Sequence, residues 1–244
     1  MTIRTTLIAT GLIAASLATA SAHAALQGRD LNGSAGSFEA YYDTELDITW
    51  LADANYAKTS GYDADGLMTW AAANTWAAQL SFTNPLTSET LDDWRLPTIT
   101  DTGTSGCNSA KSGTDCGYNV DPASSEMAHL YFTELGNLSH YTTTGAVSGA
   151  YAGGSNPNST LDNVGPFTNF QSYLYWSGTE YAPSTAYAWS FRTDYGYQYN
   201  YYETLSFYAL AVRPGDVAAV PEAETYALML AGLGLIGWRA RRRG

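Results

Sequence analysis

The sequence predicts an α+β domain in which two helices pack with an antiparallel sheet. Three observations support this fold class. Apolar residues recur at helical spacing in two separate segments, and several short aromatic strands separated by turns follow from residue 173 onward. Between the helices and these strands, residues 136–169 are rich in Gly, Ser, Thr and Asn and show little periodicity, which indicates a long loop.

The first elements are predicted between residues 38 and 80. The segment FEAYYDTELDITWL, residues 38–51, contains two aromatic strand signals on either side of an acidic turn. A helix is predicted next, because apolar residues recur at helical spacing at Leu67, Trp70, Ala73, Ala77 and Leu80. A second helix is predicted from Ser125 to Leu135, and Gly136 provides its stop signal.

The strand signals after residue 173 are YLYWSGTEY, TAYAWSFRTD, YGYQYNYY and LSFYALAVRPG. The third lies within DYGYQYNYY, residues 194–202, which holds five tyrosines. Because strand side chains alternate between two faces, Tyr195, Tyr197, Tyr199 and Tyr201 are expected to share one face, with the residues between them on the other. A fully buried face of tyrosines would need a partner for every phenolic oxygen, so we expect this face to be half exposed.

A half-exposed tyrosine face is typical of a binding surface. Tyrosine supplies rigid contact area and a polar tip at low entropic cost. We therefore predict a ligand-binding face made of Tyr195, Tyr197, Tyr199, Tyr201 and Tyr202. The alternative interpretation is structural: the tyrosines cover the sheet or pack under the long loop, since aromatic strands are common in β structure.

The N-terminus has the three parts of a secretory signal peptide. Arg4 precedes an apolar run from Leu7 to Leu17, and small residues lead to Ala22-His23-Ala24. The apolar run is too short for a permanent membrane span. We predict a signal peptide over residues 1–24 with cleavage after Ala24, the alternative being an ordinary buried helix.

The C-terminus, residues 218–244, also has three parts. Pro221, Glu222 and Ala223 precede a predicted short transmembrane segment, Thr225–Trp238, which is followed by Arg239, Arg241, Arg242 and Arg243. Fourteen helical residues reach about 21 Å, short of the hydrocarbon core of about 30 Å, so the segment is a poor permanent anchor. The arginines favour the cytoplasmic side, and the segment can therefore halt export.

This tail resembles the PEP-CTERM sorting signal, although Ala223 stands where that signal usually has proline. The resemblance implies transient recognition by an exosortase in a Gram-negative bacterium. The mature protein is then expected at the cell surface or in the exopolysaccharide matrix, with membrane contact only through the tail before processing. A retained tail anchor is the alternative.

The charge of the chain limits its partners. The chain carries 23 Asp and Glu against 11 Lys and Arg, a net charge of −12. Five of the basic residues lie in the two terminal segments, so the central domain, residues 25–217, is more acidic still. Such a domain is repelled by phosphate backbones, which argues against nucleic acid as a partner. Neutral glycans, cationic groups and divalent metals remain compatible with this charge.

The two cysteines, Cys107 and Cys116, lie close together in GCNSAKSGTDCG. In an exported protein this spacing predicts one local disulfide that closes a Gly/Ser-rich loop. Metal binding is the weaker interpretation, because a zinc site needs four ligands and C-x-x-C-like spacing is absent.

The order of motifs adds a resemblance that spans residues 38–216. The segments YYDTELDITWLADANYAKTSGYDADGLMTW, DDWRLPT, SEMAHLYFTELGN, YWSGTEY, AYAWSF and AVRPGD resemble the Lcl C-terminal domain family, which looks related to the C-type-lectin-like and sulfatase-modifying-factor folds. The resemblance implies two helices, a small twisted antiparallel sheet, neighbouring N- and C-terminal strands, and long loops on one side.

We interpret the signature residues of these motifs as framework. Trp94, Trp176 and Trp189 are large enough to anchor a core. Arg95 and Arg213 are expected to pair with carboxylates such as Glu180.

Enzyme chemistry finds little support. His129 lies within the second predicted helix and His140 in a polar loop, and the usual nucleophile, zinc and phosphate-binding motifs are absent. Asp92 and Asp93 leave a glycosidase site open, although an acidic protein supplies such pairs by chance. No cofactor is identified. Calcium stays open without a ligand set, because residues 61–72 lack the Asp and Glu that an EF-hand loop needs at its ends.

These observations predict a non-catalytic binding module, exported to the surface or matrix. Its expected ligand is an extracellular polysaccharide or a surface protein. Two alternatives stay open: a glycan-active enzyme and a passive structural protein of the biofilm matrix.

Overall fold

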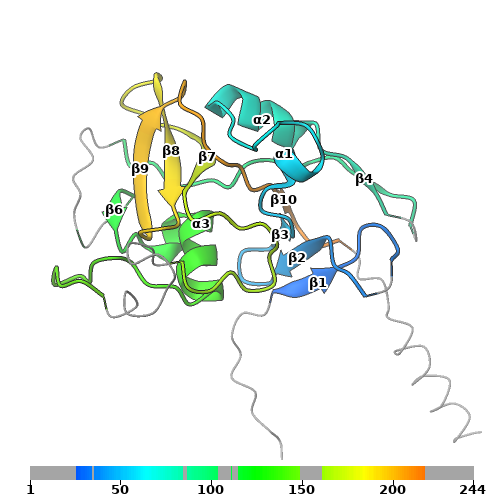
Figure 1. Ribbon diagram of the computed structural model, residues 1–244, viewed down its shortest axis with the longest axis horizontal. Helices are drawn as coiled ribbons and strands as arrows, with labels where there is room; N and C mark the ends of the chain where they lie inside the picture. The colour runs from blue at the N-terminus through cyan, green and yellow to red at the C-terminus, as the bar shows by residue number, and fades with distance from the viewer. Residues whose placement is uncertain are drawn as a thin grey trace, which may run out of the picture.

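The protein is described by a computed structural model, which covers residues 26–34, 36–84, 87–103, 111, 115–148 and 161–217. The predicted signal peptide and C-terminal tail lie outside these residues. Two four-stranded sheets, a short hairpin and several short helices make up the described part (Figure 1). All strand pairs are antiparallel, so the predicted α+β class is confirmed.

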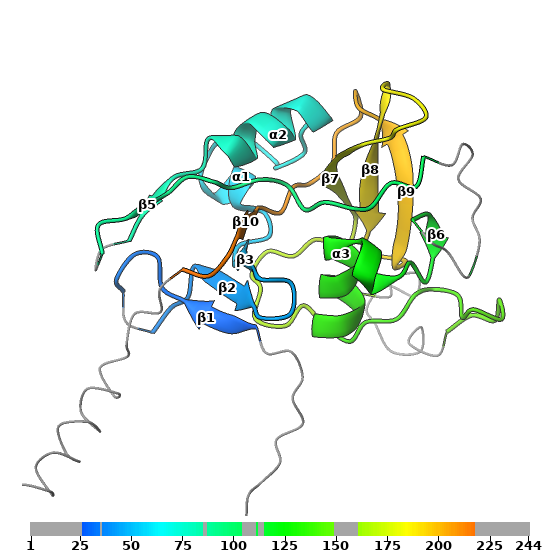
Figure 2. The ribbon, with the colours of Figure 1, turned by 180° about the vertical axis from the view of Figure 1, so that it is seen from behind.

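The first sheet joins the two ends of the domain. Its order is β1 (Gln27–Arg29), β2 (Ala40–Asp43), β3 (Ile48–Leu51) and β10 (Val212–Pro214). Strands β2 and β3 form the hairpin predicted over residues 38–51, and Asp47 in its turn has a φ of 52°. Strand β10 comes from the far end of the chain and pairs with β3, so the first and last strands share one sheet (Figure 2).

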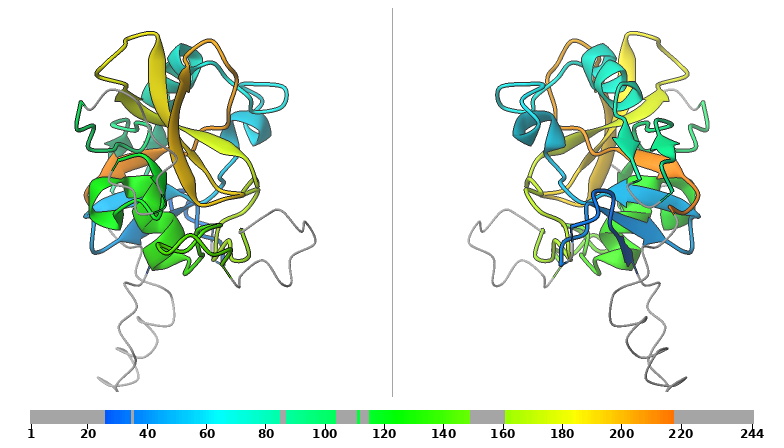
Figure 3. Two further views of the ribbon diagram at one scale, coloured as in Figure 1. Left: turned by 90° about the vertical axis from the view of Figure 1, so that its left-hand side faces the viewer. Right: turned by 90° about the vertical axis from the view of Figure 1, so that its right-hand side faces the viewer.

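The second sheet carries the tyrosine-rich strand. Its order is β6 (Gly117–Tyr118), β9 (Tyr197–Tyr202), β8 (Tyr187–Arg192) and β7 (Leu174–Glu180). Figure 3 shows the twist of its three long strands. The strands predicted over YLYWSGTEY, TAYAWSFRTD and YGYQYNYY are therefore confirmed.

The fourth predicted strand, LSFYALAVRPG, is shorter than expected. Only Val212–Pro214 forms a strand, and that strand belongs to the first sheet. The preceding residues cross between the sheets, where Phe207 bridges to Met68 and Tyr208 to Tyr175. The neighbouring N- and C-terminal strands implied by the resemblance are present in the first sheet, and the small twisted antiparallel sheet is accompanied by a second four-stranded sheet.

Both predicted helices are present. Helix α2 (Trp70–Ala78) begins after Thr69, whose hydroxyl accepts a hydrogen bond from the Ala72 N–H at 3.4 Å. The short α1 (Tyr56–Thr59) precedes it, and the hairpin of β4 (Phe82–Thr83) and β5 (Thr90–Leu91) follows it.

The second helix changes its hydrogen-bonding pattern along its length. A 3₁₀ turn, η1 (Pro122–Ser124), leads to α3 (Glu126–Ala128), which continues as a π-helix, η2 (His129–Glu134). Ser125 Oγ accepts from the Ala128 N–H at 3.2 Å and caps the helix. At the other end the Leu135 N–H donates to the Leu130 carbonyl at 2.9 Å, five residues back.

The core occupies both faces of the second sheet. Leu174 and Trp176 of β7 point to one face and Tyr175 to the other, as strand alternation requires. On the α2 side the buried residues include Ala73, Trp76, Ala77, Leu174, Trp176 and Ala188. On the side of α3 and η2 they include Met127, Leu130, Tyr131, Tyr175 and Phe191.

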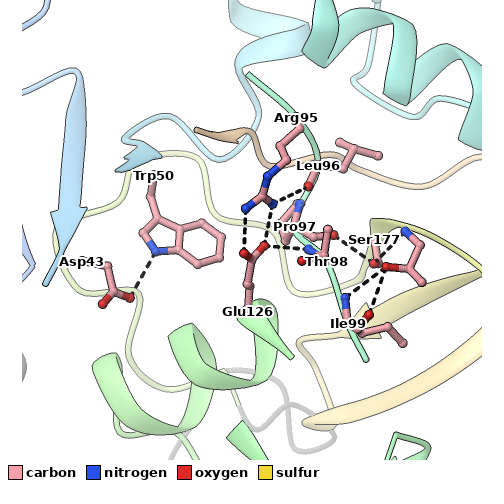
Figure 4. Close-up of polar contacts among 10 residues, drawn as sticks. Asp43, Trp50, Arg95, Leu96, Pro97, Thr98, Ile99, Glu126 and Ser177 are labelled. Atoms are coloured by element: carbon pink, nitrogen blue, oxygen red, sulfur yellow. Dashed lines mark hydrogen bonds and ion pairs between the residues drawn. The ribbon is translucent and has the colours of Figure 1, made fainter. Parts of the chain in front are cut away.

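The tryptophans predicted to anchor the core are buried, and the predicted arginines form ion pairs. Trp94, Trp176 and Trp189 are all buried. Arg95 forms a bidentate pair with Glu126, at 2.7 Å for both nitrogen–oxygen contacts, and a Glu126 oxygen also accepts from the Thr98 N–H (Figure 4).

Both arginines pair with carboxylates as predicted, but Glu180, the example named, is not the partner. Arg95 pairs with Glu126, and Arg213 pairs with Asp93 at 2.7 Å. The partners follow from how α3 and the segment before residue 95 pack, which local sequence does not encode.

Candidate functional site

The predicted tyrosine face is half exposed. Tyr197, Tyr199 and Tyr201 alternate along β9 with the buried Gln198 and Asn200. We call the three rings the tyrosine face. Strand β6 pairs only with the first two residues of β9, so most of the outer edge of β9 has no neighbouring strand among the described residues (Figure 1).

The opposite side of β9 is fixed to the interior. Gln198 is fully buried, its side-chain Nε2 donates to the Asp115 carbonyl at 2.8 Å, and its Oε1 accepts from Ser125 Oγ at 2.7 Å. Buried polar groups are stable only when they are hydrogen-bonded in this way. The orientation of the tyrosine face is thus set by its polar neighbours.

The rings of the tyrosine face contact one another. The Tyr197 and Tyr199 rings are stacked, with centroids 5.8 Å apart and planes 14° apart. Tyr199 contacts Tyr201 edge to face at 5.4 Å, and Tyr201 contacts Phe207 of the core at 5.3 Å. Burial raises the pKa of Tyr201, while Arg192 acts in the opposite direction. Tyr201 is therefore the member of the face that packs against the core.

The aromatic surface extends beyond β9. Tyr118 of β6 packs on Tyr197 at 4.6 Å and on Tyr141 at 4.9 Å. His140 lies 4.5 Å from Tyr141 and 5.1 Å from Tyr195, and burial lowers its pKa. We call the tyrosine face together with these four rings the aromatic band. Sequence reasoning did not place Tyr118, His140 and Tyr141 there, because the pairing of β6 with β9 and the hydrogen bond from the His140 N–H to the Tyr195 carbonyl join segments far apart in the chain.

Tyr195 joins this surface by a different route from the one predicted. It lies in the β8–β9 turn rather than in the strand, and Gly196 after it has a φ of 57°. Its ring lies under the Arg192 guanidinium at 4.6 Å. Arg192 also pairs with Asp194 at 2.7 Å, and this hydrogen bond raises the pKa of Arg192.

Tyr202 is not part of the tyrosine face. It follows Tyr201 in the strand, so it points to the opposite side of β9. There its ring lies on that of Tyr187, with centroids 4.1 Å apart. At 54% exposure it is the most accessible of the five predicted tyrosines.

A pocket of about 690 Å³ opens elsewhere, between the β1–β2 loop, α1 and residues 166–168. This volume is typical of small-molecule sites. The aromatic residues lining the pocket are Phe38, Tyr41, Tyr56 and Phe82, and Glu39 and Asp53 add carboxylates. The residues that line the pocket come from four separate segments of the chain, so no single stretch of sequence predicts the pocket.

A buried cluster of one histidine and two carboxylates lies where the first sheet meets η2. The candidate ligand atoms of Asp43, His129 and Glu134 all lie within 4.8 Å of one another. His129 Nε2 is 3.3 Å from Glu134 Oε1 and 3.6 Å from Asp43 Oδ2. Burial, Asp43 and Glu45 raise the pKa of Glu134 to about 7. Among the described residues, this is the cluster whose side chains could hold a metal ion.

Several other candidate residues from the sequence form contacts that stabilise the fold. Asp93 is engaged by Arg213, and the exposed Asp92 lies beside it. In the loop of residues 61–66, Asp63 accepts backbone hydrogen bonds from Asp65 and Gly66. Cys116 is disulfide-bonded, but Cys107, its predicted partner, lies outside the described residues.

The family comparison bears on the C-terminal tail. The PEP-CTERM protein-sorting motif matches residues 219–243. The chain carries an exosortase sorting signal. This match confirms the prediction made from Pro221, Glu222, Ala223 and the terminal arginines, all of which it includes. A chain with this motif is exported, recognised by an exosortase and processed at a membrane.

The central domain has no such match. No curated protein and no solved structure matches the chain. The Lcl and C-type-lectin-like resemblance therefore has no support from the comparisons and stays a prediction. Among the described residues, no helix has the length and apolar character needed to cross a membrane, and the predicted segment Thr225–Trp238 lies outside them.

Proposed function

We propose that this exosortase-sorted protein is a non-catalytic binding module whose aromatic band contacts neutral polysaccharide at the cell surface or in the extracellular matrix. The observation that carries the proposal is the half-exposure of Tyr197, Tyr199 and Tyr201 on one side of β9, while Gln198 and Asn200 between them are buried. A framework strand of the same composition would bury the rings as well.

The chemistry of the band supports a neutral ligand. Ring faces offer apolar contact and phenolic oxygens offer hydrogen bonds, a combination that suits the apolar faces and hydroxyl groups of sugar rings. The domain is strongly acidic, so an anionic polymer would be repelled. Among the described residues, two cations lie beside the band: Arg192, with which Asp194 already pairs, and Lys111, whose Nζ lies 4.4 Å from the centre of the Tyr141 ring.

The ring contacts also lower the cost of binding. Tyr197 and Tyr199 are stacked, and Tyr118 packs on Tyr197, so these side chains are held before a ligand arrives. Side chains that are already ordered lose little entropy on binding. An extended polymer can lie across several such rings in succession.

The test uses the secreted protein with Tyr197→Ser and Tyr199→Ser combined. Tyr62→Ser is the matched control, because Tyr62 is 47% exposed and lies after α1, away from the aromatic band. Binding is measured on immobilised dextran, xylan and cellulose, with alginate as the anionic polymer. We expect the double variant to lose at least tenfold in affinity for a neutral polymer, and the control to match the wild type.

Unfolding curves complete the test. Truncating one fully buried aromatic side chain costs about 3–5 kcal/mol, so a half-exposed face should lose less per ring. Normal binding by the double variant would rule the face out as the site. Collapse of its stability would show the rings to be framework. Release of soluble sugars from any of the polymers would instead support the alternative of a glycan-active enzyme.

A further inference from the structure

We propose that Asp43, His129 and Glu134, with Glu45 at the rim, form a binding site for a divalent transition-metal ion, for which Zn²⁺ is the fitting probe. The site is separate from the aromatic band. It joins the β2–β3 hairpin of the first sheet to η2.

The distances fit a small metal ion. A tetrahedral zinc site with metal–ligand distances of about 2.0–2.2 Å places its ligand atoms about 3.3–3.6 Å apart. His129 Nε2 lies 3.3 Å from Glu134 Oε1, 3.6 Å from Asp43 Oδ2 and 3.7 Å from Glu45 Oε2. The ligand atoms of Asp43, His129 and Glu134 also all lie within 4.8 Å of one another, while Glu45 approaches the cluster from its rim beside His129.

Glu134 provides an independent reason to expect a cation. Its side chain is only 1% exposed, and its Oε2 atom is buried without a hydrogen-bond partner among the described residues. A buried carboxylate without full pairing is costly. A divalent cation held between Glu134, Asp43 and His129 would offset this cost.

The π-helix places two of the ligands. In an α-helix, side chains five residues apart point about 140° away from each other. The i→i+5 hydrogen bonds of η2 wind more residues into each turn, and this brings His129 and Glu134 to one side of the helix. Such π-turns are uncommon and are frequent at functional sites.

Asp43 is oriented by its surroundings. Its Oδ1 accepts from the Glu45 and Leu46 N–H groups, both at 3.0 Å, and Oδ2 is left toward His129. The Trp50 indole N–H also lies 3.4 Å from Oδ2 (Figure 4). Hydrogen bonds of this kind hold metal-ligating carboxylates in place.

The donor set selects the type of ion. Calcium prefers six to eight oxygen ligands, whereas imidazole suits zinc and its neighbours among the transition metals. Glu45 is 52% exposed, so the site reaches the surface and an ion can enter from solvent.

The experiment uses the full exported protein, stripped with EDTA and dialysed against Zn²⁺. We expect one zinc per chain by elemental analysis, and a melting temperature about 5–10 °C higher at a hundredfold excess over Kd. His129→Gln and Glu45→Gln should each weaken zinc binding at least tenfold, while His140→Gln, the matched control, should bind as the wild type does.

Three results would overturn the proposal: no bound zinc, unchanged affinity in His129→Gln, or an equal loss in His140→Gln. Displacement of zinc by an equal concentration of Ca²⁺ would also contradict the assigned donor set. Circular dichroism checks that His129→Gln is folded. If it is not, Glu45→Gln decides the question, because that exposed side chain can lose its charge without opening a cavity.

Discussion

Arg29 and Asp216, which lie 187 positions apart in the sequence, form a two-point ion pair that joins the ends of the domain. Arg29 Nε is 2.6 Å from Asp216 Oδ1, and Nη2 is 2.8 Å from Oδ2. The Arg29 side chain is 7% exposed and that of Asp216 is 40% exposed. The last residue in this contact, Asp216, therefore lies just before the sorting signal, which begins at residue 219.

Removing this pair should destabilise the domain moderately. Asp216→Asn leaves the buried Arg29 guanidinium with weaker pairing, and we expect the free energy of unfolding to fall by about 1–2 kcal/mol. Urea unfolding of the exported protein measures this. Asp92→Asn serves as the control because Asp92 is exposed, and it should change little. Equal stability of Asp216→Asn and the wild type would show that the pair contributes nothing.

Gln198 should matter more for stability than the tyrosines beside it. Gln198→Leu leaves the Asp115 carbonyl without its donor and Ser125 Oγ without its acceptor, both in the interior. We expect a loss of about 2–4 kcal/mol. The comparison with Tyr197→Ser is made in the same urea series. If Tyr197→Ser lost more stability than Gln198→Leu, the tyrosine face rather than the Gln198 side of β9 would be the part that stabilises the fold.

The disulfide should be useful but dispensable. Cys107 and Cys116 are expected to be joined, and replacing both with serine should cost roughly 2–3 kcal/mol without unfolding the domain. Cys116 is buried in a small cluster with Tyr181 and Trp189, so part of this cost is lost packing. Free thiols in the secreted protein, detected by alkylation and mass spectrometry, would refute the pairing.

The C-terminal signal should be absent from the mature protein. Since the ion pair of Arg29 and Asp216 closes the fold before residue 219, cleavage within the tail should leave the domain intact. Mass spectrometry of surface or matrix fractions should find no Arg239–Arg243 peptide. The variant with Pro221→Ala and Glu222→Ala should keep it. An intact tail on the wild-type surface protein would contradict processing.

Local sequence determined where both helices and the strands β7, β8 and β9 lie, and it carried the sorting signal. The alternation in DYGYQYNYY predicted which tyrosines of β9 share a face, because alternation is a property of the strand alone. Ser125 and Gly136 predicted the limits of the second helix, because caps and stops are local hydrogen-bonding effects. The tail was recognisable because sorting signals are read as linear sequence.

Tertiary structure alone decided what those elements contact. The pairing of β10 with β3 and of β6 with β9 joins segments far apart in the chain, so it depends on the whole core rather than on any window of sequence. That pairing adds Tyr118 to the aromatic band. Likewise, Asp43 and His129 meet only because the first sheet packs on η2. The sequence alone shows His129 as an ordinary helix residue and does not reveal its carboxylate neighbours.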